Sequence, residues 1–166
     1  NYIHIYLLGI LLLSVACTGK FREFNTDQSG ITDEDLIEVV LHGSNSYPFQ
    51  FYYEDLSVFD FNCIEWHWHT ELEFIYIESG TVTLWIGEDQ FHLTEGNGIF
   101  INTKVLHRLY SPSKALIPNF VFMPSFIAPR DSLIYQKYIL PIISSSLPFL
   151  VFNKKVCWQA KVLSIM

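Results

Sequence analysis

The segment HWHTELEFIYIESG, residues 67–80, is the most informative part of this chain. Side chains alternate along a β-strand, so His67 and His69 project from the same face. Glu73 lies four residues beyond His69 and shares that face if no bulge intervenes. A second segment, GNGIFINTKVLH, ends at His107, and a neighbouring strand of a closed barrel can bring this histidine against the other three. Together the two segments predict one pocket lined by His67, His69, Glu73 and His107.

These four side chains suit two kinds of ligand. Three imidazoles and a carboxylate are a usual ligand set for iron, manganese, nickel or zinc. The same groups can hydrogen-bond a sugar or another polar small molecule, and then no cofactor is required. Each histidine alone is more often a structural residue, whereas the set predicts a pocket; metal coordination by His67, His69, Glu73 and His107 stays open. Trp85 is a further candidate ligand-binding residue, because an aromatic face can lie beside a sugar, with packing as the alternative.

The flanking sequence predicts a mostly β domain over residues 37–130. Short runs rich in Tyr, Phe, Val and Ile, separated by Gly, Pro, Asn and Asp, are typical of many short strands. Ser79-Gly80 offers a hairpin turn, with glycine available for positive φ. The predicted strands cover 48–55, 57–66, 73–78, 81–86, 91–93, 98–102, 107–110 and 119–124.

Residues 131–166 follow a different pattern, which predicts short helices after the barrel. Asp131 can cap a helix that runs from residue 132 toward 140 and that Pro141 stops. Residues 147–152 form a short apolar strand, and residues 156–165 form an amphipathic helix.

The charge distribution argues against a nucleic-acid-binding protein. The net charge is −7, and residues 1–103 hold sixteen acidic residues against Lys20 and Arg22. Residues 104–166 hold eight Lys and Arg against one acidic residue, but these cations are scattered through an apolar background. We therefore expect a solvated surface rather than a DNA-binding face. Three cysteines without metal-type spacing do not indicate a disulfide framework.

The two histidine segments resemble the motifs of the cupin superfamily. His67, His69, Glu73 and Gly80 match the first motif, and Gly96 and His107 match the second. Four positions depart from the usual residues, namely Phe61 and Lys104 for glycine, Asn102 for proline and Ser111 for asparagine. The resemblance implies a cupin-type double-stranded β-helix barrel, and the departures in the second motif bear on metal binding.

The sequence is more similar to one branch of that superfamily. The run HWHTELEFIYIESGTVTLWIGEDQFHLTEGNGIFINTKVLHRLYSP resembles the N-terminal ligand-binding domain of AraC-type transcriptional regulators, and the similarity covers roughly residues 40–166. It implies a cytoplasmic sensor domain that binds a small-molecule effector and can form a homodimer. In that family DNA is bound by a C-terminal helix-turn-helix domain, so we expect a chain truncated before that domain and without direct DNA binding.

The N-terminal part of the chain has a different character. Residues 1–17 contain a 14-residue apolar run, which spans about 21 Å as a helix and is shorter than a bilayer core of about 30 Å. This length favours a signal-peptide core, with Cys17 as the lipid-bearing residue of a lipoprotein; a buried apolar helix is the alternative. The polar leader, residues 18–36, resembles the mature start of SusD-like lipoproteins, and Thr32 followed by two acids predicts a helix start.

Three functions are therefore open. The first is the effector-binding and dimerisation domain of an AraC-type regulator, which is not an enzyme. The second is a metal-dependent cupin enzyme, a dioxygenase or isomerase. The third is a lipid-anchored carbohydrate-binding protein of the cell envelope, in contact with the membrane only if residues 1–17 act as a lipoprotein signal. The leader resembles an envelope lipoprotein, whereas the sensor resembles a cytoplasmic regulator. A junction of two unrelated coding sequences near residues 36–37 would explain why both occur in one chain.

Overall fold

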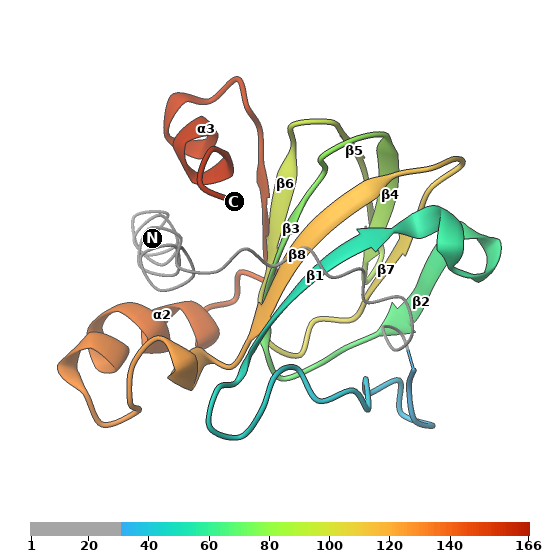
Figure 1. The fold of residues 1–166 in the computed structure, drawn as a ribbon. Helices are drawn as coiled ribbons and strands as arrows, with labels where there is room; N and C mark the ends of the chain where they lie inside the picture. The colour runs from blue at the N-terminus through green and yellow to red at the C-terminus, as the bar shows by residue number, and fades with distance from the viewer. Residues whose placement is uncertain (1–30) are drawn as a thin grey trace.

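The computed structural model describes residues 31–166, which fold into two antiparallel sheets and a few short helices (Figure 1). The predicted apolar helix of residues 1–17, Cys17 and most of the polar leader 18–36 lie outside the described residues. One sheet has five strands, in the spatial order β1 (Phe49–Asp55), β8 (Leu116–Phe122), β3 (Leu72–Tyr76), β6 (Gly98–Ile101) and β9 (Phe149–Phe152). The other has four, in the order β2 (Cys63–His67), β7 (His107–Tyr110), β4 (Thr81–Ile86) and β5 (Asp89–Thr94).

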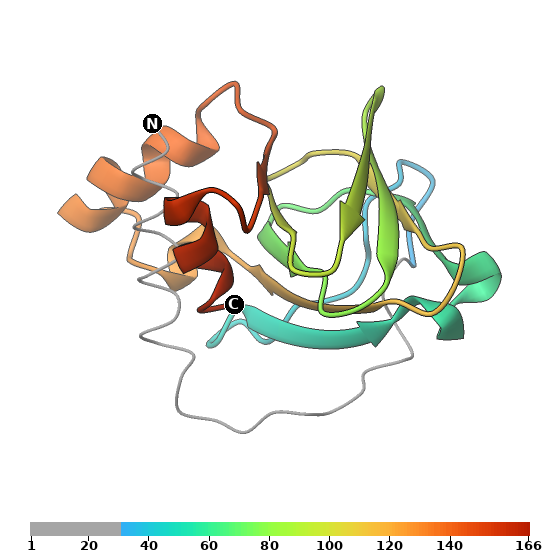
Figure 2. The same ribbon diagram turned by 90° about the horizontal axis from the view of Figure 1, so that it is seen from above.

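The two sheets face each other and close around an aliphatic core (Figure 2). Inward-pointing side chains from both sheets meet there, because every second residue of a strand points to the same face. Ile75 of β3 and Ile99 of β6 contribute from one sheet, and Leu84 of β4 and Leu109 of β7 from the other. This arrangement confirms the prediction of a mostly β, cupin-type barrel.

A second core lies on the outer face of the five-stranded sheet and is mainly aromatic. Phe74 of β3 and Phe100 of β6 point away from the barrel interior, with ring centroids 5.0 Å apart. They pack against the C-terminal segment, which comprises the π-helical turn η4 (Tyr135–Ile139), α2 (Leu140–Ile143) and α3 (Cys157–Leu163) (Figure 1). Because both faces of β3 are covered, its inward residues, Glu73 among them, are buried.

The C-terminal predictions are confirmed in outline, with one correction to the first helix. Strand 147–152 is β9, and helix 156–165 is α3. The first helix is capped by Ser132 rather than Asp131, because the Ser132 hydroxyl accepts a hydrogen bond from the Tyr135 N–H at 3.1 Å. Pro141 does not stop this helix but lies in the first turn of α2. A proline lacks the N–H of a regular turn, and the turn that precedes it here is π-helical.

The first half of the predicted strand 57–66 is wrong. Two short 3₁₀ turns, η1 (Leu56–Val58) and η2 (Asp60–Asn62), precede β2. Phe61 and Asn62 have φ values of 56° and 54°, and this left-handed backbone cannot continue a strand. A further 3₁₀ turn, η3 (Pro124–Phe126), follows β8.

The helix start predicted at Thr32 is also wrong. Residues 31–38 form a tight turn in which the Asp33 carboxylate accepts hydrogen bonds from the N–H groups of Asp35 and Ile37, both at 2.9 Å. A bridge between Thr32 and Glu38 closes the turn. Short acidic side chains satisfy turns as readily as helix starts, so the sequence pattern fits both. Within residues 31–166, no helix has the length and apolar character that crossing a bilayer requires.

Candidate functional site

The four residues predicted to share a pocket come together from both sheets. His67, the last residue of β2, is paired with His107, the first residue of β7, and their ring centroids lie 4.1 Å apart. His69 follows two residues after β2, and its ring centroid is 5.4 Å from that of His107. Glu73 projects into the same space from β3 of the opposite sheet.

One carboxylate oxygen contacts two of the three histidines. Glu73 Oε2 accepts a hydrogen bond from His69 Nε2 at 3.3 Å and lies 3.1 Å from His107 Nε2. The second contact is short, but its angle is not that of a hydrogen bond, so His107 Nε2 has no hydrogen-bond partner among the described residues. All four residues, including His67, are at most 5% exposed.

Backbone carbonyls orient two of the three imidazoles. His67 Nδ1 lies 2.7 Å from the Glu65 carbonyl, and His107 Nδ1 lies 2.9 Å from the Val105 carbonyl. A carbonyl oxygen can only accept, so each Nδ1 carries a proton and donates it. At His67 this leaves the Nε2 lone pair for a ligand, which is how the outer contacts of a metal-binding histidine set its tautomer. At His107, Nε2 lies against the Glu73 carboxylate.

The pKa values of the residues in the cluster shift in different directions. Burial alone would raise the pKa of the Glu73 carboxyl, but its contacts with His107 and His69 hold that pKa well below the ordinary value. Burial lowers the pKa of His69, but the hydrogen bond with Glu73 outweighs it, so the pKa lies above 6.5. Burial and the neighbouring His107 lower the pKa of His67 to about 4. His67 therefore stays a neutral electron-pair donor beside a carboxylate.

The donor chemistry of this cluster fits a divalent transition metal. Ligand atoms of His67, His69 and His107 all lie within 4.8 Å of one another. His69 Nδ1 and His107 Nε2 are buried without a hydrogen-bond partner in the described part of the chain. Imidazole nitrogens together with the Glu73 carboxylate suit iron, manganese, nickel or zinc.

A small cavity extends from the cluster toward β1 and β8. Its volume is about 20 Å³, which accommodates about one water-sized group. His67, His69 and Glu73 line it, whereas His107 is fully buried behind them. A sugar or similar molecule therefore enters only if the surrounding segments move.

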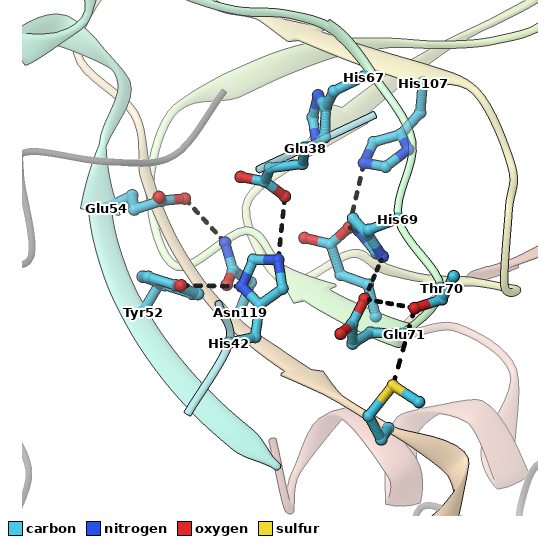
Figure 3. Close-up of polar contacts among 12 residues, drawn as sticks. Glu38, His42, Tyr52, Glu54, His67, His69, Thr70, Glu71, His107 and Asn119 are labelled. Atoms are coloured by element: carbon cyan, nitrogen blue, oxygen red, sulfur yellow. Dashed lines mark hydrogen bonds and ion pairs between the residues drawn. The ribbon is translucent and has the colours of Figure 1, made fainter. Parts of the chain in front are cut away.

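The far wall of this cavity contains polar residues that the sequence did not reveal as a group. His42 Nε2 lies 3.0 Å from Glu38 Oε2, and His42 Nδ1 lies 2.8 Å from the Tyr52 hydroxyl (Figure 3). Burial lowers the pKa of His42, but Glu38 outweighs this effect and raises it. Beyond this triad, the Asn119 amide donates to Glu54 at 2.8 Å.

Glu38 and His42 reach the cavity on an irregular arm, residues 36–42, which lies along the end of β2. The Glu38 N–H donates to the Trp68 carbonyl and the Trp68 N–H donates to the Leu36 carbonyl, both at 3.0 Å. The Trp68 indole also donates to the Asp35 carbonyl at 3.0 Å. Ordinary backbone pairing thus places two ionisable side chains over the cavity.

Trp85 is not brought into this group. Its neighbours in β4, Leu84 and Ile86, point into the barrel core, so Trp85 points outward. The guanidinium of Arg108 lies 5.1 Å from its ring centroid, and this contact is a surface cation–π pair.

Comparisons with known proteins agree with this geometry. Residues 63–117 match the model of the family described as Cupin domain. An uncharacterized HTH-type transcriptional regulator of Bacillus subtilis, YdeC, is 26% identical over 137 residues, which cover 80% of this chain and 46% of that protein. The chain thus spans about half the length of the curated relative that it matches.

Solved structures that resemble the chain do so at low identity. A conserved protein of unknown function from Streptococcus pyogenes is 16% identical with a TM-score of 0.44, over 64% of this chain and 98% of the other. A cupin superfamily protein from Desulfitobacterium hafniense is 10% identical with a TM-score of 0.43, over 49% and 71%. Oxalate decarboxylase of Bacillus subtilis, which has Mn(II) centres, is 19% identical with a TM-score of 0.35, over 37% and 18%.

Proposed function

We propose that residues 37–166 are the effector-binding domain of an AraC-type transcriptional regulator. The observation that carries this proposal is the buried polar cavity inside the barrel, whose wall includes His67, His69 and Glu73. Sequence similarity to an HTH-type regulator supports it. The effector is a polar small molecule, with a sugar as one class, and the domain acts in the cytoplasm, where a regulator meets DNA.

A continuous route joins the cavity to the helices. Glu73 is paired with Ile101 of β6, and the next residue, Asn102, donates hydrogen bonds to the carbonyls of Ile142 and Leu147. An effector that binds better to one position of β6 therefore favours one position of α2. In this proposal the helices form the homodimer contact, and DNA is bound outside residues 37–166.

The test is thermal unfolding with a panel of D-glucose, D-galactose, D-xylose and L-arabinose. A sugar that stabilises the wild-type protein should lose its effect in the variant His67→Gln/His107→Gln. His92→Gln is the matched control, because His92 is exposed on β5 and its Nδ1 contacts only the Thr83 hydroxyl among the described hydrogen bonds. Stabilisation that persists in the double variant would mean that neither histidine takes part in sugar binding. Sedimentation with and without that sugar tests whether it changes dimerisation.

A metal-dependent cupin enzyme is the second candidate, favoured by the convergence of three imidazoles, two of which contact the Glu73 carboxylate. His67, His69, His107 and Glu73 would hold the ion, and the carbonyls of Glu65 and Val105 would keep two rings in position. A bound ion would supply Lewis-acid or oxygen-activating chemistry.

Elemental analysis of the purified protein separates the two functions. Near-stoichiometric iron, manganese or nickel, lost in His107→Gln and kept in His92→Gln, favours the enzyme. A protein that neither carries nor takes up these metals in titration is not a metal-dependent enzyme.

A further inference from the structure

The far end of the cavity is lined by two buried polar side chains, Asn119 and Glu54. Asn119 of β8 is in register with Tyr52 of β1 on one side and with Ile75 of β3 on the other. Ile75 and Glu73 share the inward face of β3, so the Asn119 side chain lies in the cavity wall. Glu54, two residues after Tyr52, lies on the same face of β1. Asn119 is 4% exposed and Glu54 is 2% exposed.

The orientation of the Asn119 amide follows from its neighbour. The Glu54 carboxylate is an acceptor, so the group 2.8 Å from it is the amide nitrogen of Asn119. The other end of the amide, Oδ1, is then buried without a hydrogen-bond partner among the described residues. A buried carbonyl oxygen without a hydrogen bond is unfavourable, so this atom requires a donor from a ligand or a water molecule.

The charge of the wall restricts what that donor can be. Three carboxylates, Glu38, Glu54 and Glu73, line the cavity, and no lysine or arginine in residues 31–166 does so. Two of the three lining imidazoles, His42 and His69, already contact Glu38 and Glu73. The region around Asn119 and Glu54 therefore repels an anion and favours a cation.

We infer that this end of the cavity is a subsite for the ammonium group of a primary amine, with Asn119 Oδ1 and the Glu54 carboxylate as its acceptors. An ammonium has three donors and no acceptor, which suits the Asn119 amide oxygen and the Glu54 carboxylate. It is also about as large as a water molecule, which is what the cavity accommodates. The inference rests on the proposed effector-binding function and narrows the effector from a polar molecule to an amine.

The test uses methylammonium chloride and the full chain, followed by thermal unfolding and by calorimetric titration. Three control solutes accompany methylammonium. Potassium chloride controls for ionic strength, ethylene glycol for binding of a neutral hydroxyl, and sodium acetate for binding of an anion. We expect saturable stabilisation by methylammonium beyond that of potassium chloride, and none by the other two. Equal effects of methylammonium and potassium chloride, or stabilisation by ethylene glycol or acetate, would overturn the subsite and leave Asn119 bound to water.

A variant pair locates the effect. Glu54→Gln keeps an acceptor for the Asn119 amide but removes the charge, and should weaken methylammonium binding about tenfold or more. Glu88→Gln is the control, because Glu88 is exposed in the turn between β4 and β5 and does not line the cavity. Equal affinity in wild type and Glu54→Gln would contradict the assignment. If Glu54→Gln does not fold, the wild-type solute series still decides.

Different results would reject the effector-binding function and the ammonium subsite. A sugar that stabilises the wild type but not His67→Gln/His107→Gln, with no response to methylammonium, would retain the effector domain and reject the ammonium subsite. A methylammonium response that Glu54→Gln loses, without any change in dimerisation, would retain the subsite and count against the regulator.

Discussion

The side-chain amide of Asn102 donates a hydrogen bond to the carbonyl oxygen of Ile142 at 2.9 Å, and this contact ties the barrel to helix α2. A second hydrogen bond from the same nitrogen reaches the Leu147 carbonyl at 3.0 Å, and the Asn102 N–H donates to the Pro148 carbonyl at 2.8 Å. Asn102 is 4% exposed and follows β6, the strand that pairs with Glu73. Asn102, which stands where the second cupin motif commonly has proline, thus forms a polar link between β6 and the C-terminal segment.

We expect Asn102→Asp to lower the free energy of unfolding by about 2–4 kcal/mol in urea titrations. A carboxylate has the same shape but cannot donate, so it would face two carbonyl oxygens and lose both hydrogen bonds. Asn153→Asp is the matched control, because Asn153 is exposed and its oxygen accepts a hydrogen bond from the Lys155 N–H, which a carboxylate retains. Equal stability of the two variants would mean that the Asn102 amide does not hold the helix.

Gly80 and Gly87 offer a second comparison, because both have positive φ but different surroundings. The φ values are 86° and 56°. A Cβ at Gly80 would lie 2.7 Å from the Lys114 carbonyl oxygen, whereas a Cβ at Gly87 would meet nothing within 4 Å. Gly87→Ala should cost about 1 kcal/mol from the left-handed backbone alone. Gly80→Ala should cost about 2–4 kcal/mol, since a backbone clash is added. Calorimetric melting of both variants measures the difference, and equal costs would show that the strands can separate at Gly80.

Side-chain alternation explains why the histidine cluster could be predicted. His67 and His69 lie two residues apart at the end of β2, so alternation places them on one face. Glu73 lies beyond a bend at residues 70–71, on β3 of the opposite sheet, so it reaches the cluster because the two sheets face each other and not because of its spacing from His69. His107 required one further assumption, that the barrel closes, and closure pairs it directly with His67. Strand positions followed from the same alternation and from the glycine turns.

The far wall of the cavity was not predicted, for two physical reasons. Glu38 and His42 lie on an arm without regular secondary structure, so no periodicity marks the direction of their side chains. Asn119 did carry a signal, because it has the strand parity of Ile117 and Val121, which are buried. A polar residue at an inward position of an apolar strand indicates a cavity or a hydrogen-bonded partner. The turn at Phe61 did carry a signal, because this residue stands where the first cupin motif usually has glycine, the residue that favours positive φ.

Asp55 predicts a pH dependence of stability. Burial raises the pKa of its carboxyl, but hydrogen bonds from Ser57 and the nearby Lys114 outweigh it, so the pKa lies below the ordinary 3.8. The folded state then binds this proton more weakly than the unfolded state, so the stabilisation is present above about pH 4 and is lost as the pH falls through the lowered pKa.

Asp55→Asn should therefore be less stable by about 0.5–2 kcal/mol near neutral pH, because the Asp55 cap, which accepts hydrogen bonds from the Ser57 N–H and hydroxyl, is weakened. The difference from wild type should shrink as the pH falls below about 4. Urea titrations across the acid range measure it. Lys114→Gln is the control, since Lys114 is 68% exposed and an exposed ion pair contributes only about 0–1 kcal/mol. A difference that stays constant with pH would assign the effect to packing.

The tautomer of His67 is the most direct test of the site geometry. Its Nδ1 lies 2.7 Å from the Glu65 carbonyl, and burial together with His107 lowers its pKa to about 4. At about pH 7 the ring should therefore be neutral with its proton on Nδ1, leaving Nε2 free to bind a ligand. Long-range ¹H–¹⁵N correlation spectra distinguish the two tautomers, and His67→Gln assigns the signals by their loss. His92, which is exposed and contacts the Thr83 hydroxyl, gives a reference for an imidazole outside the cluster. A proton on Nε2 of His67 would point that nitrogen's N–H into the cavity and would exclude His67 as a metal ligand in this arrangement.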